Sequence, residues 1–154
     1  MNLVDELYAV TAALTAAGIL YAVCGGIAVT AHGAPRTTKD IDILVYRNDV
    51  RRVLDVVRPL GYDIPALPMT FDAGTERERH IQRVSKVEGP HHLLLDVLIA
   101  EAAYAGTLED RVEVTLPAGT LAMVSRATLI RMKRLAGRPI DLQDLENLGA
   151  NDGR

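Results

Sequence analysis

Apolar residues recur along the first part of the chain with two different periods, and each period predicts an element. In residues 3–17, LVDELYAVTAALTAA, they recur every three or four positions, which is typical of a helix, and Gly18 suits its end. The short apolar run ILYAVC after it predicts a buried strand, which leads directly into Gly25 and Gly26. We expect a short helix over residues 27–32 to follow.

Strict alternation predicts a strand at residues 40–46, DIDILVY. The segment NDVRRVLDVVRPL after it has helical spacing and ends near Pro59 and Gly61. Residues 80–87 and 92–99 predict a β-hairpin around the turn EGPH, and the second strand is the more apolar and hence the more central one.

Two further segments complete the predicted order. The stretch PALPMTFDAGTERER is rich in turn formers and charge, and the sequence predicts no element there. Near the end, SRATLIRMKRLA predicts a helix capped by Ser125 and ended by Gly137, and Pro139 suits the first residue of a final helix through Leu148. The expected fold class is α/β (α+β), a mixed sheet packed with helices in two layers.

Composition narrows the class of protein. At 154 residues, we expect a single domain over residues 1–154, with a helical C-terminal segment at about 125–149. The net charge of −3 argues against a generally basic nucleic-acid-binding surface but leaves room for a local basic patch. No apolar run approaches the roughly 20 residues that span a bilayer, and the single cysteine, Cys24, cannot form an internal disulfide. We therefore expect a cytoplasmic protein that contacts no membrane.

Asp40 and Asp42 are the first candidates for chemistry. Side chains alternate between the faces of a strand, so both carboxylates project from one face, with Cα atoms roughly 6 to 7 Å apart. Two carboxylates at that distance repel one another unless a cation lies between them, and Mg²⁺ prefers such oxygen ligands. A strand end with two solvent-facing aspartates is the alternative, and the D-x-D pattern alone favours it.

Gly25 and Gly26 indicate an anion site beside these acids. A strand that runs into two glycines and opens a helix presents backbone N–H groups to a phosphate, with no Cβ in the way. A tight turn without a ligand explains the pair equally well. The dinucleotide pattern G-x-G-x-x-G and the phosphate-loop motif are absent, which disfavours those other nucleotide-binding folds.

Asp96 is the third acid of interest. It lies between LLL and VLI in the apolar second strand of the hairpin, where burial of an unpaired carboxylate is costly. We expect it to have a partner, either an arginine or a shared metal ion, and the two other acids favour the metal ion.

Other polar residues flank these acids. Arg36, Thr38 and Lys39 lie in the turn just before the D-x-D strand, where they either contact a triphosphate or acceptor or face solvent. Asp144 lies in the first turns of the last helix, where an acid is favourable for the helix dipole whatever its function. We rank Asp144 as a possible site residue.

Two strings in the sequence resemble a known family. GGIAVTAHGAPRTTKDIDILV resembles the motif of the polymerase-β-type nucleotidyltransferases, in which a Gly-Gly or Gly-Ser pair precedes a D-x-D strand and a third carboxylate follows on a later strand. More narrowly, VSRATLIRMKRLAGRPIDLQDLENL is similar to the C-terminal motif of the AbiEii-type toxin nucleotidyltransferases and their relatives. The resemblance covers nearly the whole chain and implies the nucleotidyltransferase fold.

The resemblance implies an enzyme that transfers a nucleoside monophosphate from an NTP to a hydroxyl acceptor and releases pyrophosphate. It implies that the phosphates bind at Gly25 and Gly26. It also implies that Asp40, Asp42 and Asp96 are catalytic and bind two Mg²⁺ ions, for which Mn²⁺ can substitute. One ion would lower the pKa of the incoming hydroxyl and the other would neutralise the leaving pyrophosphate.

Lys133 matches a lysine of the C-terminal motif, and the resemblance implies that it reaches the nucleotide phosphates. A solvated basic face shared with Arg126 and Arg134 is the alternative. Gly26 stands where many family members carry a serine, so a hydroxyl contact to the triphosphate is missing there and only the backbone N–H remains.

Three hypotheses remain for the function, and two of them differ in the acceptor. The toxin-type enzymes imply tRNA or protein, with a cognate antitoxin or toxin as partner. The second is a small molecule such as an aminoglycoside or lincosamide, and the third is a nucleotide-binding module that has lost catalysis. A basic groove lined by Lys39, Arg126, Lys133 and Arg134 would favour tRNA, whereas a closed acidic pocket would favour a cationic drug.

Overall fold

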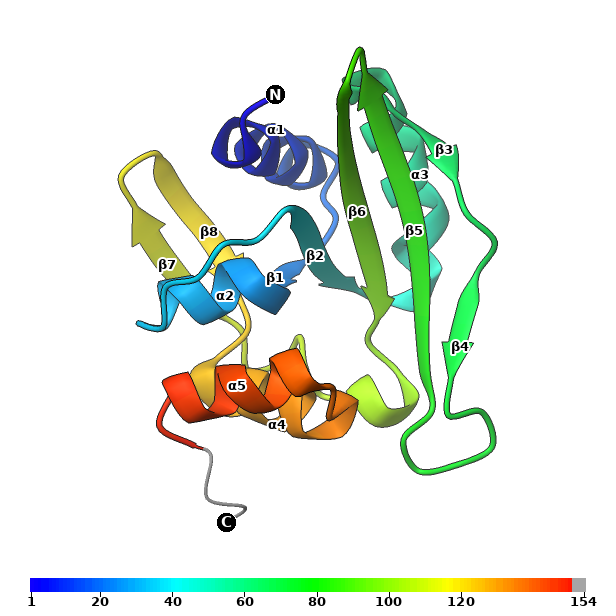
Figure 1. Ribbon diagram of the computed structural model, residues 1–154. Coiled ribbons are helices and arrows are strands. Elements are labelled where there is room, and N and C mark those ends of the chain that lie inside the picture. The colour runs from blue at the N-terminus through cyan, green and yellow to red at the C-terminus, as the bar shows by residue number, and fades with distance from the viewer. Residues whose placement is uncertain (151–154) are drawn as a thin grey trace.

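The computed structural model describes residues 1–150, which form one eight-stranded mixed sheet with five α-helices (Figure 1). The helices are α1 (Leu3–Ala16), α2 (Gly25–Ala31), α3 (Val50–Val57), α4 (Arg126–Ala136) and α5 (Pro139–Asn147). The strands are β1 (Ala22–Cys24), β2 (Asp40–Val45), β3 (Tyr62–Pro65), β4 (Met69–Phe71), β5 (Arg79–Glu88), β6 (His91–Ile99), β7 (Val112–Leu116) and β8 (Gly119–Met123). The predicted α/β (α+β) class is confirmed.

The sheet has the order β3-β5-β6-β2-β1-β8-β7, and β4 pairs with β5 as well. At its centre β2 and β6 run parallel, whereas β5 and β6 form an antiparallel hairpin. The register places Asp42 opposite Asp96 and also opposite Cys24, while Arg83 lies opposite Asp96 from the other side. Four neighbouring strands thus bring these residues into one row across the sheet.

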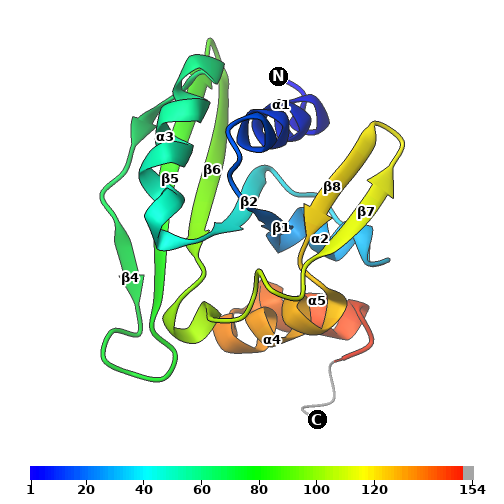
Figure 2. The ribbon, with the colours of Figure 1, turned by 180° about the vertical axis from the view of Figure 1, so that it is seen from behind.

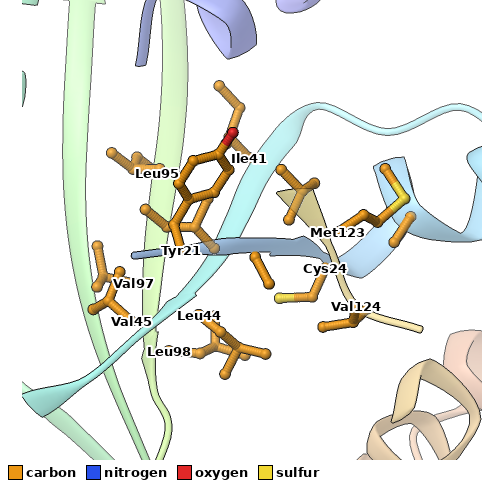
Figure 3. Packing of buried hydrophobic residues seen from close by; sticks show 14 of the residues in the cluster. Tyr21, Cys24, Ile41, Leu44, Val45, Leu95, Val97, Leu98, Met123 and Val124 are labelled. Carbon is orange, nitrogen blue, oxygen red and sulfur yellow. The ribbon is translucent and has the colours of Figure 1, made fainter. Parts of the chain in front are cut away.

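The two faces of the sheet differ in character because of the alternation in β2. Ile41, Ile43 and Val45 are fully buried and lie on the face that α1 and α3 cover (Figures 1 and 2). Figure 3 shows Leu95 and Val97 of β6 packed in the same core. The opposite face carries the acids of β2 and β6, and α2, α4 and α5 lie beside its lower end in Figure 1.

Most of the predicted helices are confirmed within one or two residues. Ser125 caps α4 by accepting a hydrogen bond from Thr128, and Gly137 ends it in the left-handed region at φ 62°. The helix after the glycine pair begins earlier than predicted, at Gly25 itself. Gly25 has φ +67°, which glycine adopts without steric cost, so the pair forms the first turn of the helix.

Four strands were not predicted. β3 and β4 are short and their side chains are largely exposed, so they lack the alternation that marks a half-buried strand. The β7–β8 hairpin forms the other edge of the sheet, and the Tyr8 hydroxyl donates a hydrogen bond to the Gly119 carbonyl there at 2.9 Å. Among residues 1–150, no helix has the length and apolarity to cross a bilayer.

Candidate active site

A cleft of about 530 Å³ opens on the polar face of the sheet, between β2, β6 and β5 on one side and α4 and α5 on the other. Eight of the ten predicted site residues line it, namely Gly25, Gly26, Arg36, Thr38, Asp40, Asp42, Asp96 and Lys133. Lys39 and Asp144 are not among its lining residues. The fold therefore brings the predicted phosphate seat and the predicted acids into one cavity.

The three acids lie on the same face of adjacent strands. Asp42 is directly opposite Asp96 in the parallel β2–β6 pair, and Asp40 lies two residues earlier on β2. Asp96 is only 8% exposed, whereas Asp40 and Asp42 are partly exposed to the cleft. The ion pairs of residues 1–150 involve Asp96 but neither Asp40 nor Asp42.

The carboxyl group of Asp42 is strongly perturbed by its surroundings. Burial, followed by the negative charges of Asp96 and Asp40, raises the pKa of Asp42 to about 7. The positive charges of Lys133 and Arg138 lower that pKa but do not cancel the rise. At neutral pH the Asp42 carboxylate is therefore easily protonated or bound by a cation.

Both glycines are required by close neighbours within the chain. A Cβ at Gly25 would lie 2.0 Å from Asp42 Oδ2. At Gly26 it would lie 2.8 Å from Thr38 Oγ1 and 3.1 Å from Arg36 Nη1. The sequence suggested that glycine leaves room for a phosphate. The structure adds a second reason, because the acid and the predicted phosphate-binding side chains pack directly on the glycine backbone.

Gly25→Ala should therefore weaken Mn²⁺ binding at least tenfold, because the new methyl group must displace the Asp42 carboxylate. The strained φ alone should cost about 1 to 3 kcal/mol of stability. Gly18→Ala is a matched control, since Gly18 has φ +71° and an added Cβ there would have no neighbour within 4 Å. Titration calorimetry and thermal melting of both variants check the prediction. Equal Mn²⁺ affinity in the two variants would contradict it.

Asp96 has an arginine partner, which was the less favoured of the two partners predicted from the sequence. Arg83 donates from Nε to Oδ1 at 2.8 Å and from Nη2 to Oδ2 at 2.9 Å, so both oxygens of Asp96 accept. Sequence reasoning missed Arg83, although the hairpin contains a usable signal. The two-residue turn pairs Glu88 with His91, and counting back along both strands from that pair leads to Arg83 opposite Asp96.

The three acids do not form a preformed metal cage. Among residues 1–150, no group of three or more His, Cys, Asp or Glu side chains converges as a metal site. Both oxygens of Asp96 are bonded to Arg83, and Asp42 lies against Gly25. The residues nevertheless fit a divalent cation by chemistry and placement. They are hard oxygen donors at neighbouring positions of one face, and the mutual repulsion of Asp42 with Asp40 and Asp96 is what a cation relieves.

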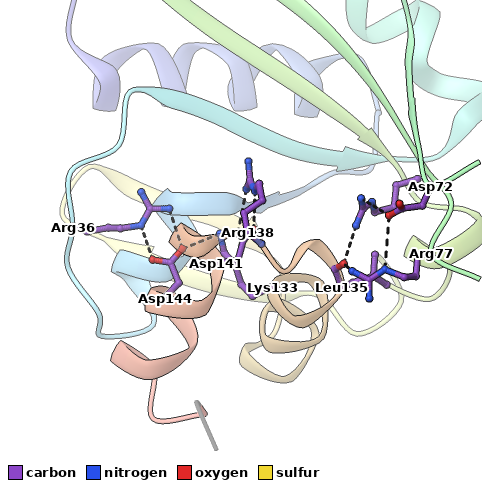
Figure 4. Close-up of polar contacts among 9 residues, drawn as sticks. Arg36, Asp72, Arg77, Lys133, Leu135, Arg138, Asp141 and Asp144 are labelled. Carbon is purple, nitrogen blue, oxygen red and sulfur yellow. Dashed lines mark hydrogen bonds and ion pairs between the residues drawn. The ribbon is translucent and has the colours of Figure 1, made fainter. Parts of the chain in front are cut away.

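Lys133 lies in a buried ion-pair network at the edge of the cleft, and Figure 4 shows the network. Its Nζ is 3.0 Å from Asp141 Oδ1 and 2.9 Å from Asp144 Oδ2. Arg36 donates to both oxygens of Asp144 at 2.7 and 3.1 Å, and Arg138 donates to Asp141. The network joins α4, α5 and the turn before β2, so it fixes Arg36 relative to the glycine pair.

The structure corrects one prediction for Asp144 on α5 and one alternative considered for Lys133 on α4. Asp144 is fully buried, so it does more than compensate the helix dipole. Lys133 is 6% exposed, so the alternative of a solvated basic face with Arg126 and Arg134 is wrong. Those two arginines donate to the Leu148 and Ala150 carbonyls.

Burial opposes the charge of Asp141, but the hydrogen bond from Arg138 and the charge of Lys133 together hold the pKa of Asp141 below its ordinary value. Asp141 therefore stays ionised inside the network. Its contact with Nζ holds Lys133 in place at the edge of the cleft.

Beyond Arg83, the far end of the cleft is basic and apolar. Arg79 is 8% exposed, donates to the Leu135 carbonyl at 3.0 Å and to Asp72 at 3.0 Å, and lies 5.6 Å from the ring centre of Phe71. Ile81, Leu98 and Phe71 complete this wall. The sequence offered no hint of it, because β4 and its pairing with β5 were not predicted.

No protein-family model and no curated protein matches the chain. Solved structures do match it over nearly its whole length. The lincosamide antibiotic adenylyltransferase LnuA, in a lincomycin-bound crystal structure, is 15% identical, with a TM-score of 0.61 and 96% of each chain covered. The Thermotoga maritima protein TM1012, assigned as a nucleotidyltransferase, is 11% identical, with a TM-score of 0.64 and coverage of 93% of this chain and 89% of that one.

A third solved structure is ANT(2″)-Ia in complex with adenylyl-2″-tobramycin. It is 15% identical, with a TM-score of 0.57 and coverage of 96% of this chain and 86% of that one. The protein therefore has the nucleotidyltransferase fold, as the resemblance to the polymerase-β-type superfamily implied. The narrower likeness to AbiEii-type toxins has no counterpart among these three structures.

Proposed function

We propose that the protein is a Mg²⁺-dependent nucleotidyltransferase, which moves a nucleoside monophosphate from an NTP to a hydroxyl acceptor and releases pyrophosphate. The observation that carries the proposal is the single cleft in which Gly25 and Gly26 adjoin Asp40, Asp42 and Asp96. The shared fold with nucleotidyltransferases supports it. A plain turn or a pair of solvent-facing acids would not require this convergence.

The nucleotide phosphates belong at the glycine end of the cleft. There the backbone N–H groups of Gly25 and Gly26 are available without a Cβ, and Thr38 and Arg36 lie against Gly26. Lys133 also lines the cleft, but its Nζ is paired with two carboxylates, so it contributes little net positive charge there. Lys39 lies outside the lining, so we assign it a role at the rim at most.

The acids hold the centre of the cleft. Mg²⁺ or Mn²⁺ bound by Asp40, Asp42 and Asp96 would lower the pKa of the attacking hydroxyl and neutralise charge on the leaving pyrophosphate. Because the row across the sheet runs from the glycines through Asp42 to Asp96 and Arg83, Asp96 is the acid nearest the acceptor end.

An RNA such as tRNA, or a protein, is the acceptor that we favour. The acceptor end contains Arg79 and Arg83, and the carboxylate that approaches it, Asp72, is paired with Arg79. Arg83 is likewise paired with Asp96, so the charges at this end balance and do not by themselves select an anionic or a cationic acceptor. The basic groove considered from the sequence is not the one formed, since Lys39, Arg126 and Arg134 lie outside the cleft lining. We extend the proposal to a toxin–antitoxin pair on the C-terminal motif alone.

A small-molecule acceptor is the second candidate. It is supported by LnuA, solved with lincomycin, and by ANT(2″)-Ia, solved with adenylyl-2″-tobramycin. The non-catalytic nucleotide-binding module is the third. Asp42 weighs against that module, because a carboxylate whose pKa is raised by burial and by two neighbouring acids is typical of a catalytic site.

The test combines transfer with metal binding. The protein is incubated with each radiolabelled NTP and Mg²⁺ in the presence of RNA, protein and small-molecule fractions, and label should appear in one of them. Mn²⁺ binding is measured in parallel at pH 6 and pH 8. Because the cation binds ionised Asp42, whose pKa is about 7, affinity should be roughly tenfold weaker at pH 6. No labelled fraction together with pH-independent Mn²⁺ binding would falsify the enzyme assignment.

A further inference from the structure

Arg83 is the only cation within residues 1–150 that pairs with one of the three acids of the cleft. It holds both oxygens of Asp96 in a bidentate contact at 2.8 and 2.9 Å. The hydrogen bond to Asp96 raises the pKa of Arg83, burial opposes the rise, and the charges of Asp96, Asp40 and Asp42 add to it. The Arg83 guanidinium therefore interacts electrostatically with all three carboxylates.

We propose that Arg83 is an internal counter-ion for the metal site. In the metal-free protein this positioning residue orients Asp96 and balances its charge, and it gives up Asp96 when a divalent cation binds. The inference rests on the proposed function, because it assumes that Asp96 ligates the cation. It adds a residue that sets the affinity for the cation without ligating it.

The charges of the site require such an exchange. With Arg83 paired to Asp96, the three carboxylates and the guanidinium carry a net charge of −2, and release of the guanidinium returns the full charge of −3 to the site, which attracts a divalent cation more strongly. A divalent cation at Asp96 lies within a few ångströms of the guanidinium, and like charges at that distance repel strongly. One of the two cations must therefore move away from Asp96.

Arg83 is the partner that is able to move. Its side chain is 36% exposed, whereas the Asp96 side chain is 11% exposed and lies between buried residues of β6. The long Arg83 side chain can change rotamer and place its guanidinium in water, whereas the short Asp96 side chain is fixed by the strand. In residues 1–150 no metal cage is preformed, and Arg83 occupies both Asp96 oxygens.

The experiment measures Mn²⁺ affinity of the full chain with a non-hydrolysable NTP analogue, from the electron paramagnetic resonance signal of free Mn²⁺. Arg83→Gln removes the competing charge, so Mn²⁺ should bind on the order of tenfold more tightly. Arg83→Lys keeps the charge and should return the affinity to near that of the parent. Arg77→Gln is the control, because it removes an equal charge from a half-exposed side chain outside the cleft lining. We expect it to change the affinity less than twofold.

Thermal melting separates this role from a purely structural one. Arg83→Gln should melt below the parent without metal, and Mn²⁺ should restore the difference. If Arg83→Gln folds only in the presence of Mn²⁺, the exchange is supported, whereas failure to fold there as well overturns it. Unchanged or weaker Mn²⁺ binding by Arg83→Gln, with a parent that binds Mn²⁺, overturns the inference and leaves the proposed function intact. A parent that binds no Mn²⁺ overturns both.

Discussion

Asp42→Asn should abolish most nucleotidyl transfer and yet make the protein more stable at pH 8. Removal of a metal ligand should cost at least about 100-fold in activity, because loss of groups that merely orient such ligands already costs 10–100-fold. The stability gain follows from the pKa of about 7 that burial and the neighbouring acids impose on Asp42. The ordinary pKa of an aspartate side chain is 3.8, so the folded state holds this proton more tightly than the unfolded state.

The sign of the pH dependence follows from that difference. Between about pH 4 and pH 7 the folded protein binds more protons at Asp42 than the unfolded chain does, so the free energy of unfolding falls as pH rises. Above pH 7 Asp42 is ionised in both states, and the folded state carries the full free-energy cost of the buried charge. Asparagine removes it, and we expect a gain of about 1 to 3 kcal/mol at pH 8, after allowance for the partial exposure of the side chain.

Urea unfolding at pH 4.5 and pH 8 measures the effect, with the parent beside Asp42→Asn. The difference between the two proteins should be small at pH 4.5 and largest at pH 8. Asp63→Asn is the control, because Asp63 is an exposed strand aspartate whose replacement should change stability by less than 0.5 kcal/mol. An Asp42→Asn protein that is less stable than the parent at pH 8 would show that Asp42 is held by a favourable contact instead.

Asp144→Asn should destabilise the protein by about 3 to 5 kcal/mol, as expected when one partner is removed from a buried ion pair. Asp144 is fully buried, accepts two hydrogen bonds from Arg36 and lies 2.9 Å from Lys133 Nζ. Its neutralisation takes away the charged partner of Arg36 and leaves Lys133 with Asp141 alone, which Lys133 shares with Arg138. Released Arg36 should also weaken NTP binding, since this side chain lies against Gly26.

Glu146→Gln is the matched control for that variant, because Glu146 is exposed on the same helix. Chemical denaturation should place it within 0.5 kcal/mol of the parent. Asp144→Asn with parental stability and weakened NTP binding would mean that Asp144 acts directly at the nucleotide rather than through the network.

The local half of the site was predictable from the sequence. Alternation in DIDILVY places Asp40 and Asp42 on one face, and an apolar run that ends in two glycines predicts a strand leading into a helix. Both features depend on neighbours in the chain, and both are present in β1, α2 and β2. The cap and the stop of α4 were predictable for the same reason.

The contacts between distant segments were not predictable in this way. Apolar spacing alone placed Lys133 on an outer face, because nothing in the sequence of α4 shows that α5 covers that side with Asp141 and Asp144. The Arg36–Asp144 pair joins the turn before β2 to helix α5, and only the folded chain brings these two segments together. Arg83 is an intermediate case. The register of the predicted hairpin identifies it as the residue opposite Asp96, whereas a search for metal ligands does not consider arginine.

The parallel pairing of β2 with β6 has a consequence for how the protein folds. Asp42 and Asp96 are far apart in the chain, and parallel strands pair only after the intervening segment has crossed over. A slip of one residue would turn Asp96 toward the apolar core and expose Leu95 or Val97 in its place. Asp96 therefore disfavours the wrong strand register, because a chain with that register must bury its carboxylate in the apolar core. Assembly of the cleft and completion of the central sheet become the same event.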